Sequence, residues 1–278
     1  PSVSVRERLV VPFPEPGSWL WRTLGFSPAA GRRLARWSQW GGPLLVALLA
    51  GLPRFWRLGS PRAVVFDETY YAKDAWSMLR FGYEGTWPSS KISDPQILAG
   101  PQVIPLSDTG SFVAHPPTGK WVIALGEWIF GLTPFGWRFM TALLGTLSVL
   151  MLCRIGRRLF RSTLLGCLAG ALMAVDGLHY VMSRTALLDL VVMFFVLAAF
   201  GCLLIDRDRT REVLARKVGD RARAATSWLG PWLGWRPWRW VAGMMLGLSA
   251  GVKWSGLYFL VFFGLLTVLW DIGARRAA

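Results

Sequence analysis

Long apolar runs recur along this chain and constrain its fold more than any other feature. Crossing a hydrocarbon core of about 30 Å takes about 20 mostly apolar residues. The last run is too long for one helix and contains the sequence Gly251-Val252-Lys253-Trp254-Ser255-Gly256, so we interpret it as two helices that turn at Lys253. The sequence therefore predicts an all-α integral membrane protein with six spans. The runs cover residues 41–58, 134–153, 162–179, 185–205 and 238–272.

The composition agrees with this class. Hydrophobic residues make up 53% of the 278 residues, and the mean hydropathy is +0.40. A net charge of +15 could also indicate nucleic-acid binding, but the basic residues cluster between apolar runs and form no basic aromatic groove. We therefore expect no nucleic-acid partner. The three cysteines lack Cys-x-x-Cys spacing, and neither a His-x-x-His pair nor a carboxylate triplet is present, so we predict no disulfide framework and no metal site.

The positive charges predict the orientation of the spans. Short loops that remain in the cytoplasm are enriched in Lys and Arg. Most of the basic residues lie within 6–36, 154–161, 207–239 and 275–276, which the predicted spans bring to one side. We therefore expect a multi-pass protein of the plasma (inner) membrane with a cytoplasmic N-terminus and an extracytoplasmic active site. Residues 1–40 are a cytoplasmic lead, 41–58 the first span, 59–133 an outward catalytic loop, and 134–278 spans two to six.

The outward loop contains two segments predicted to be interfacial helices. In residues 70–81, apolar and basic side chains fall on different sides of a helix. Residues 120–131 are too few to cross a bilayer and carry Lys120 and Glu127 seven positions apart on one face, which suits an amphipathic helix on the membrane surface. Residues 82–114 are rich in Gly and Pro, and we expect an irregular loop that could cover a substrate.

Asp67 and Glu68 are adjacent carboxylates that follow the first span and precede a predicted helix. A carboxylate at a helix N-terminus is stabilised by the helix dipole. A positioned carboxylate can accept the proton of an attacking hydroxyl, which typically contributes ~10²- to 10⁴-fold to the rate. Adjacent acidic residues in a loop are more often solvated charges, so the pair alone leaves both interpretations open.

Several short strings, in this order, resemble the GT-C glycosyltransferases and, within them, the bacterial form of the protein O-mannosyltransferase family (glycosyltransferase family 39). The resemblance covers residues 41–272 and implies a GT-C-type bundle of transmembrane helices whose C-terminal part is absent from this chain. Members often carry an acidic residue two positions before His-Pro-Pro, where this chain has Val113, so no second carboxylate is assigned there. The strings are Phe66-Asp67-Glu68-Thr69-Tyr70-Tyr71-Ala72-Lys73, His115-Pro116-Pro117-Thr118-Gly119-Lys120, Arg138, Ser183-Arg184-Thr185-Ala186-Leu187-Leu188-Asp189 and Gly251-Val252-Lys253-Trp254.

The resemblance implies an inverting enzyme that moves mannose from polyprenyl-phosphate-mannose to Ser or Thr hydroxyls of exported proteins at the outer face of the plasma membrane. Its partners would be this lipid-linked donor, a secreted polypeptide and membrane lipid, with coupling to the export machinery left open. No cofactor is expected. A divalent ion held by Asp67 and Glu68 against the donor phosphate stays open, although the sequence does not support one.

The roles of the site residues follow from the same resemblance and from the chemistry. Asp67 is the candidate catalytic base, and Glu68 would orient the acceptor or a neighbouring arginine. The leaving phosphate gains negative charge and requires cationic donors arranged beforehand. Asp189 could pair with Arg184 or contact the substrate. Arg138 could instead lie at the membrane interface with its guanidinium directed toward water. His115, which precedes a proline, could serve only to set the direction in which the chain enters the next helix. The candidate phosphate ligands are Arg138, Lys253, Arg184, His115 and Lys120.

Two other function classes compete with this interpretation. A GT-C relative could glycosylate a lipid or a polysaccharide, because the acceptor is not strictly encoded in these strings. A secondary transporter also carries charges in apolar helices, but it gathers them near the bilayer midplane in repeated halves. Here the charges collect at one predicted face and the sequence shows no internal repeat.

Overall fold

The structure is a computed structural model that describes residues 9–10, 28–87, 94–100, 109–219 and 233–277. Within these ranges every helix or strand element is a helix, apart from one isolated bridge between Gly85 and Gly110. The predicted all-α class is confirmed. The helices are α3 (Pro28–Phe55), α4 (Glu68–Phe81), α5 (Asp94–Leu98), α6 (Thr118–Phe130), α7 (Pro134–Phe160), α8 (Thr163–Val175), α9 (Gly177–Met182), α10 (Leu188–Gly219), α11 (Pro237–Val252) and α12 (Gly256–Ala277).

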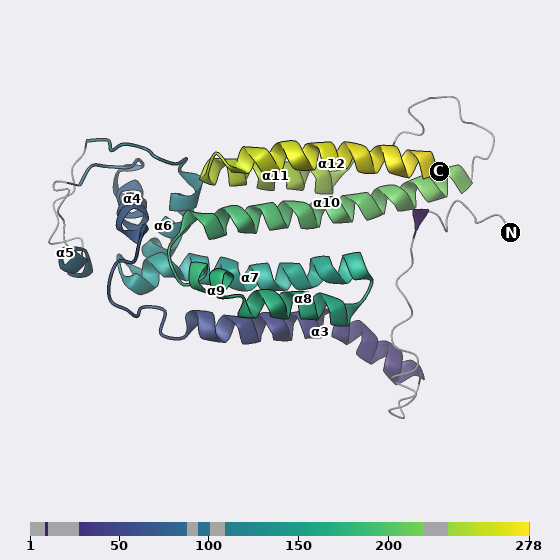
Figure 1. The fold of residues 1–278 in the computed structure, drawn as a ribbon, viewed down its shortest axis with the longest axis horizontal. Coiled ribbons are helices and arrows are strands. Elements are labelled where there is room, and N and C mark those ends of the chain that lie inside the picture. Colours follow the sequence, from purple (N-terminus) through teal and green to yellow (C-terminus); the bar gives the residue numbers. More distant parts are fainter. Residues whose placement is uncertain (1–8, 11–27, 88–93, 101–108, 220–232, 278) are drawn as a thin grey trace.

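The long helices lie side by side in one bundle, as Figure 1 shows. α3, α7 and α8 pack on one another, α10 packs with α11 and α12, and α7 joins the two groups through α10. α4, α5 and α6 gather at one end of the bundle, and the C-terminal end of α12 lies at the other (Figure 1). Among the described residues, three helices are long and apolar enough to cross a membrane, and α8 is apolar but shorter. The membrane class is therefore supported, whereas the count of six spans stays a prediction.

Several of the expected spans have different bounds. The first, expected at 41–58, is α3, which begins at Pro28, and the second continues as α7 to Phe160. The third predicted span, 162–179, is not one helix, because α8 ends at Val175 and the carboxylate of Asp176 accepts a hydrogen bond of 2.7 Å from His179 N, which starts α9. The fourth continues as α10 to Gly219, so the first part of the basic segment is helical. The turn at Lys253 is confirmed: α11 ends at Val252 and α12 begins at Gly256.

The two helices expected in the outward loop are present as α4 and α6. α6 is not oriented as an amphipathic helix at a membrane surface would be, because its charged side chains face the protein and not water. Lys120 and Glu127 are 1% and 0% exposed, whereas Trp121 and Trp128 are 43% and 72% exposed. α6 turns its charged side toward α4 and α7 because α4 and the following loop provide carboxylates for Lys120.

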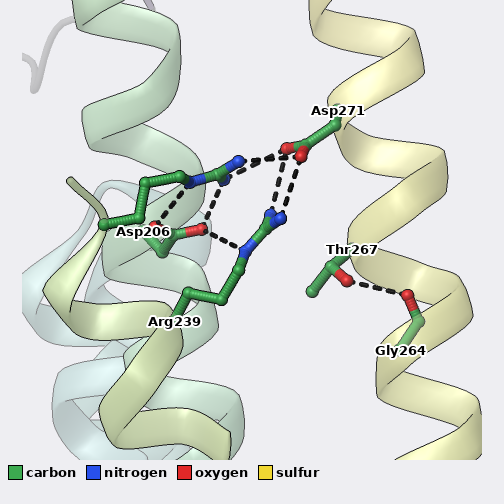
Figure 2. A network of polar contacts seen from close by, with 6 residues as sticks. Asp206, Arg239, Gly264, Thr267 and Asp271 are labelled. Carbon is green, nitrogen blue, oxygen red and sulfur yellow. Dashed lines mark hydrogen bonds and ion pairs between the residues drawn. The ribbon is translucent and has the colours of Figure 1, made fainter. Parts of the chain in front are cut away.

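The end of α10, α11 and α12 remote from α4 is joined by two arginines and two aspartates. Asp206 of α10 and Asp271 of α12 each bind the guanidinium of Arg239 in α11, at 3.3 and 3.0 Å, as Figure 2 shows. Arg236, which precedes α11, also binds both aspartates, at 2.5 and 2.8 Å. Three helices are therefore cross-linked by paired charges at this end.

Candidate active site at the end of the bundle near α4

Glu68 is the first residue of α4 and lies entirely inside the protein. Its carboxylate accepts hydrogen bonds from Nε and Nη2 of Arg138, both at 2.7 Å, and from the backbone N–H groups of Val65 at 2.9 Å and Ala186 at 3.0 Å. The side chain is 0% exposed. Glu68 therefore lies against an arginine, one of the two arrangements expected for it, and has no surface with which to contact an acceptor.

Arg138 of α7 is occupied by the protein itself. Besides its two bonds to Glu68, it donates to the carbonyls of Leu58 at 3.3 Å, Pro61 at 3.1 Å and Ala63 at 2.8 Å. A guanidinium has five N–H groups, and these contacts use all of them. We therefore do not retain the expectation that Arg138 binds the donor phosphate, nor the alternative that it extends along the interface. Its function here is to fix the loop before α4 onto α7.

The side chain of Asp67 is partly exposed, unlike that of the neighbouring Glu68. Asp67 precedes the first turn of α4 but forms no side-chain cap bond. Phe66, the residue before it, has the left-handed φ of 52°, which turns the chain sharply at this point. The hydroxyl of Tyr71 donates to Asp67 Oδ2 at 3.5 Å, one helical turn away. The structure therefore separates the two acids, leaving Asp67 accessible and Glu68 buried.

Tyr71 is a site residue to which the sequence analysis assigned no role. Burial, together with the charges of Asp67 and Asp189, raises the pKa of Tyr71 to about 12. The phenol therefore stays protonated near neutral pH and remains a donor to Asp67. The signal in the sequence is the spacing of four between Asp67 and Tyr71, which places them on one side of a helix.

Lys253 and Asp189 form an ion pair across the turn between α11 and α12. Lys253 Nζ lies 2.7 Å from Asp189 Oδ1, and the side chains are 19% and 56% exposed. Of the two alternatives considered for Asp189, the pair with Arg184 is not formed. Arg184 instead donates to the carbonyls of Pro53 and Trp56 at the end of α3. The guanidinium of Arg184 therefore binds the C-terminal end of α3, and Asp189 pairs with Lys253.

His115 lies beside Tyr71 and near the charges of Lys253 and Asp189. Its ring centroid is 6.3 Å from that of Tyr71. Burial is the main cause that lowers the pKa of His115, and the positive charges of Lys253 and Lys120 lower it further against the opposing effect of Asp189 and Asp67. At neutral pH the imidazole is therefore uncharged and can donate one hydrogen bond rather than serve as a cation.

Lys120, expected as a phosphate ligand, has carboxylate partners instead. Its Nζ lies 3.2 Å from Asp74 Oδ2 and 2.5 Å from Glu84 Oε2, and the side chain is 1% exposed. We do not retain the phosphate-binding role for Lys120. Glu84 follows α4 in a segment that we expected to be irregular, and no pattern in the sequence indicated this contact. The ion pairs of Lys120 with Asp74 and Glu84 join α6 to α4 and to the segment after it, and so support the loop that carries His115.

Asp67, Tyr71, His115, Lys253 and Asp189 therefore share one partly open region. It offers a carboxylate that can accept a proton, and an ammonium group and an imidazole that can face an anion. Within the described ranges, no group of three or more His, Cys, Asp or Glu side chains could hold a metal ion. Independence from metals and other cofactors remains a prediction.

Comparison with known proteins places the chain in a family. The chain is 42% identical over 246 residues to the polyprenol-phosphate-mannose–protein mannosyltransferase of Mycolicibacterium smegmatis (strain MKD8), covering 87% of this chain and 44% of that protein. It is 42% identical over 273 residues to the protein of the same name from Mycobacterium tuberculosis (strain H37Rv), covering 97% and 47%. The chain thus spans about half the length of these curated relatives.

The fold resembles a solved structure, that of the Saccharomyces cerevisiae protein O-mannosyltransferase Pmt1-Pmt2 complex bound to the sugar donor. The TM-score is 0.60 at 20% sequence identity, over 86% of this chain and 29% of that one. This likeness supports the predicted GT-C-type bundle. Residues 44–275 match the family model described as dolichyl-phosphate-mannose-protein mannosyltransferase. The chain therefore belongs to the dolichyl-phosphate-mannose-protein mannosyltransferase family.

Proposed function

We propose that the protein containing this chain transfers mannose from a polyprenyl-phosphate-mannose donor to Ser or Thr hydroxyls of exported polypeptides. The names of the bacterial relatives support the donor and the protein acceptor. The structural observation that carries the proposal is the accessible carboxylate of Asp67 in the same region as the Lys253–Asp189 pair and His115.

In this proposal Asp67 accepts the hydroxyl proton while the acceptor oxygen attacks the anomeric carbon, and the bond from that carbon to the phosphate oxygen breaks with inversion. The lipid phosphate leaves as a monoester with added negative charge. Lys253 would share its N–H groups between Asp189 and this phosphate, and the neutral imidazole of His115 would donate a further hydrogen bond. Arg184 lies on the same segment as Asp189, and a role for it in phosphate binding stays a prediction.

The same proposal places the site outside the plasma membrane and the N-terminus in the cytoplasm. The support is the distribution of charge: the segments 154–161, 207–217 and 236–239 lie toward the end of the bundle away from α4 (Figure 1). We propose that residues 59–133 form the outward loop and that residues 1–40 lead into the first span from the cytoplasm.

The catalytic proposal is tested by a transfer assay. Full-length protein in membranes is given synthetic polyprenyl-phosphate-mannose and a Ser/Thr-rich peptide, and mannosylated peptide is measured. Asp67→Asn should lower the turnover number by ~10²- to 10⁴-fold, because the proton acceptor is lost. Asp176→Asn is the matched control, since asparagine also caps a helix N-terminus and this residue lies outside the site.

The outcomes separate the parts of the proposal. Unchanged transfer by Asp67→Asn would remove the base assignment and leave the reaction standing. Failure of the intact protein to modify any peptide, together with transfer of mannose to a lipid or polysaccharide acceptor, would favour the alternative GT-C function.

Orientation is tested by labelling single cysteines from outside intact cells, after the native cysteines have been replaced. Val113→Cys lies in the proposed outward loop, where Val113 is 55% exposed. Arg216→Cys lies on an exposed position of α10 at the opposite end. We expect an impermeant reagent to label only the first variant, and labelling of the second would overturn the orientation.

A further inference from the structure

A cavity of about 440 Å³ lies in the half of the bundle remote from the candidate active site. It opens between α7 and α10, with Trp40 of α3 and Trp238 of α11 at its margins. The mannosyl-transfer proposal makes no use of this cavity. Its walls are mainly apolar and include Leu150, Met151, Leu197, Ala198 and Leu204.

Arginines from two successive turns of α7 line one end of this cavity: Arg154, Arg157 and Arg158. The guanidinium of Arg154 lies 3.7 Å from the centroid of the Trp40 ring and donates to the carbonyl of Gln39 at 2.7 Å. Neither partner neutralises its charge. Arg157, on the same side of α7, donates to the hydroxyl of Thr163 at 3.2 Å.

The acidic residue beside these arginines is shared. Asp208 binds Arg158 at 2.8 Å, Arg161 at 3.5 Å and Arg207 at 3.1 Å. One carboxylate therefore faces three guanidinium groups, and Arg154 adds a further positive charge at the same rim. The cavity thus combines an apolar trough with an excess of positive charge at one end, which is complementary to an amphiphile with an anionic head.

We propose that this cavity binds an anionic glycerophospholipid of the cytoplasmic leaflet. Its phosphate would lie against Arg154 and Arg158, and an acyl chain would follow the apolar walls toward the middle of the bundle. Basic pockets between helices on the cytoplasmic side bind anionic lipid head groups in this way, and tryptophans sit at the level of those head groups. The leaflet follows from the proposed orientation, which the cysteine labelling tests separately.

Native mass spectrometry of the full-length protein in detergent tests the proposal with equal amounts of phosphatidylglycerol and phosphatidylcholine. Wild-type protein should retain phosphatidylglycerol preferentially. The double change Arg154→Gln and Arg158→Gln should weaken this preference on the order of tenfold, because each basic group near a lipid head contributes attraction. Ala198→Phe should reduce retention of phosphatidylglycerol by filling the trough. Arg216→Gln is the matched charge control, being exposed and outside the cavity, and should have no effect.

Four results would overturn the proposal: equal retention of the two lipids by the wild type, an equal loss of preference in Arg216→Gln, tighter retention of polyprenyl phosphate than of phosphatidylglycerol, or undiminished retention of phosphatidylglycerol in Ala198→Phe. Undiminished retention in Ala198→Phe would show that the lipid lies elsewhere or that other parts of the full-length chain fill the cavity. If the double variant fails to fold, two other variants test the proposal. Arg154→Lys keeps the charge and should keep the preference for phosphatidylglycerol, whereas Ala198→Phe should reduce its retention. The assay requires no mannosyl transfer, so its failure and that of the proposed enzymatic function are distinguishable.

Discussion

Replacing Glu68 by glutamine should destabilise the protein strongly, although the two side chains are nearly equal in size. Glu68 is fully buried and accepts four hydrogen bonds, two of them from Arg138 at 2.7 Å. The change leaves the buried guanidinium of Arg138 without its counter-charge. Breaking a buried ion pair by altering one partner costs about 3–5 kcal/mol.

Arg138→Met should cost at least as much, since it strands the carboxylate of Glu68 and also leaves the carbonyls of Leu58, Pro61 and Ala63 without this donor. In the double variant, Glu68→Gln with Arg138→Met, no unpaired charge remains. The double variant should therefore lose less stability than the sum of the single variants, by about 1–3 kcal/mol.

The free energy of unfolding is measured on the full-length protein in detergent micelles by denaturant titration, with tryptophan fluorescence as the signal. Glu212→Gln, an exposed change on α10, is the control and should stay within about 0.5 kcal/mol of the wild type. If the free energy of unfolding of Glu68→Gln lies within about 1 kcal/mol of the wild-type value, or if the effects of the two single variants are additive, the Glu68–Arg138 pair does not stabilise the loop before α4.

Three further predictions concern other parts of the molecule. Both carboxyl oxygens of Glu127 are buried without a hydrogen-bond partner among the described residues, and burial raises its pKa well above the usual value. The pKa of Glu127 is higher in the folded state than in the unfolded state. The stability that its protonated form provides is therefore present at low pH and is lost as the pH rises through the folded-state pKa. Glu127→Met should therefore stabilise the protein by about 1–3 kcal/mol at pH 8 and less at pH 5, measured by thermal unfolding. Asp206→Asn should cost about 2 kcal/mol in the same assay by weakening the network in Figure 2. Thr267→Val is the control for Asp206→Asn and should change little, because the hydroxyl of Thr267 donates to the carbonyl of Gly264 in its own helix (Figure 2). Tyr71→Phe should lower transfer severalfold but by less than about tenfold, because the hydrogen bond from its hydroxyl to Asp67 is long. Transfer equal to that of the wild type would show that the hydroxyl of Tyr71 has no part in the reaction.

Much of the fold was predictable because its signals are local. The length of the apolar runs indicated helices, and the polar interruption at Lys253 indicated the turn between α11 and α12. The acidic pair was correctly placed at the start of α4, and the spacing of apolar residues indicated that helix. Each of these features depends on a few consecutive residues, so the chain order alone specifies them.

The sequence could not decide which charges face a substrate and which face the protein. Arg138 and Lys253 are both basic residues near the same end of the bundle, yet Arg138 is buried with all of its N–H groups occupied and Lys253 is partly exposed. The difference arises because the loop before α4 brings Glu68 and three carbonyls to Arg138 from 70 or more positions away.

In the same way, the charged side of α6 faces inward because Glu84 and Asp74 compensate the cost of burying Lys120. The sequence by itself therefore determined most of the long helices, the membrane class and the candidates for the chemistry. Only the tertiary structure decided their partners, because a buried charge is stable only where distant segments supply its counter-charge and hydrogen bonds.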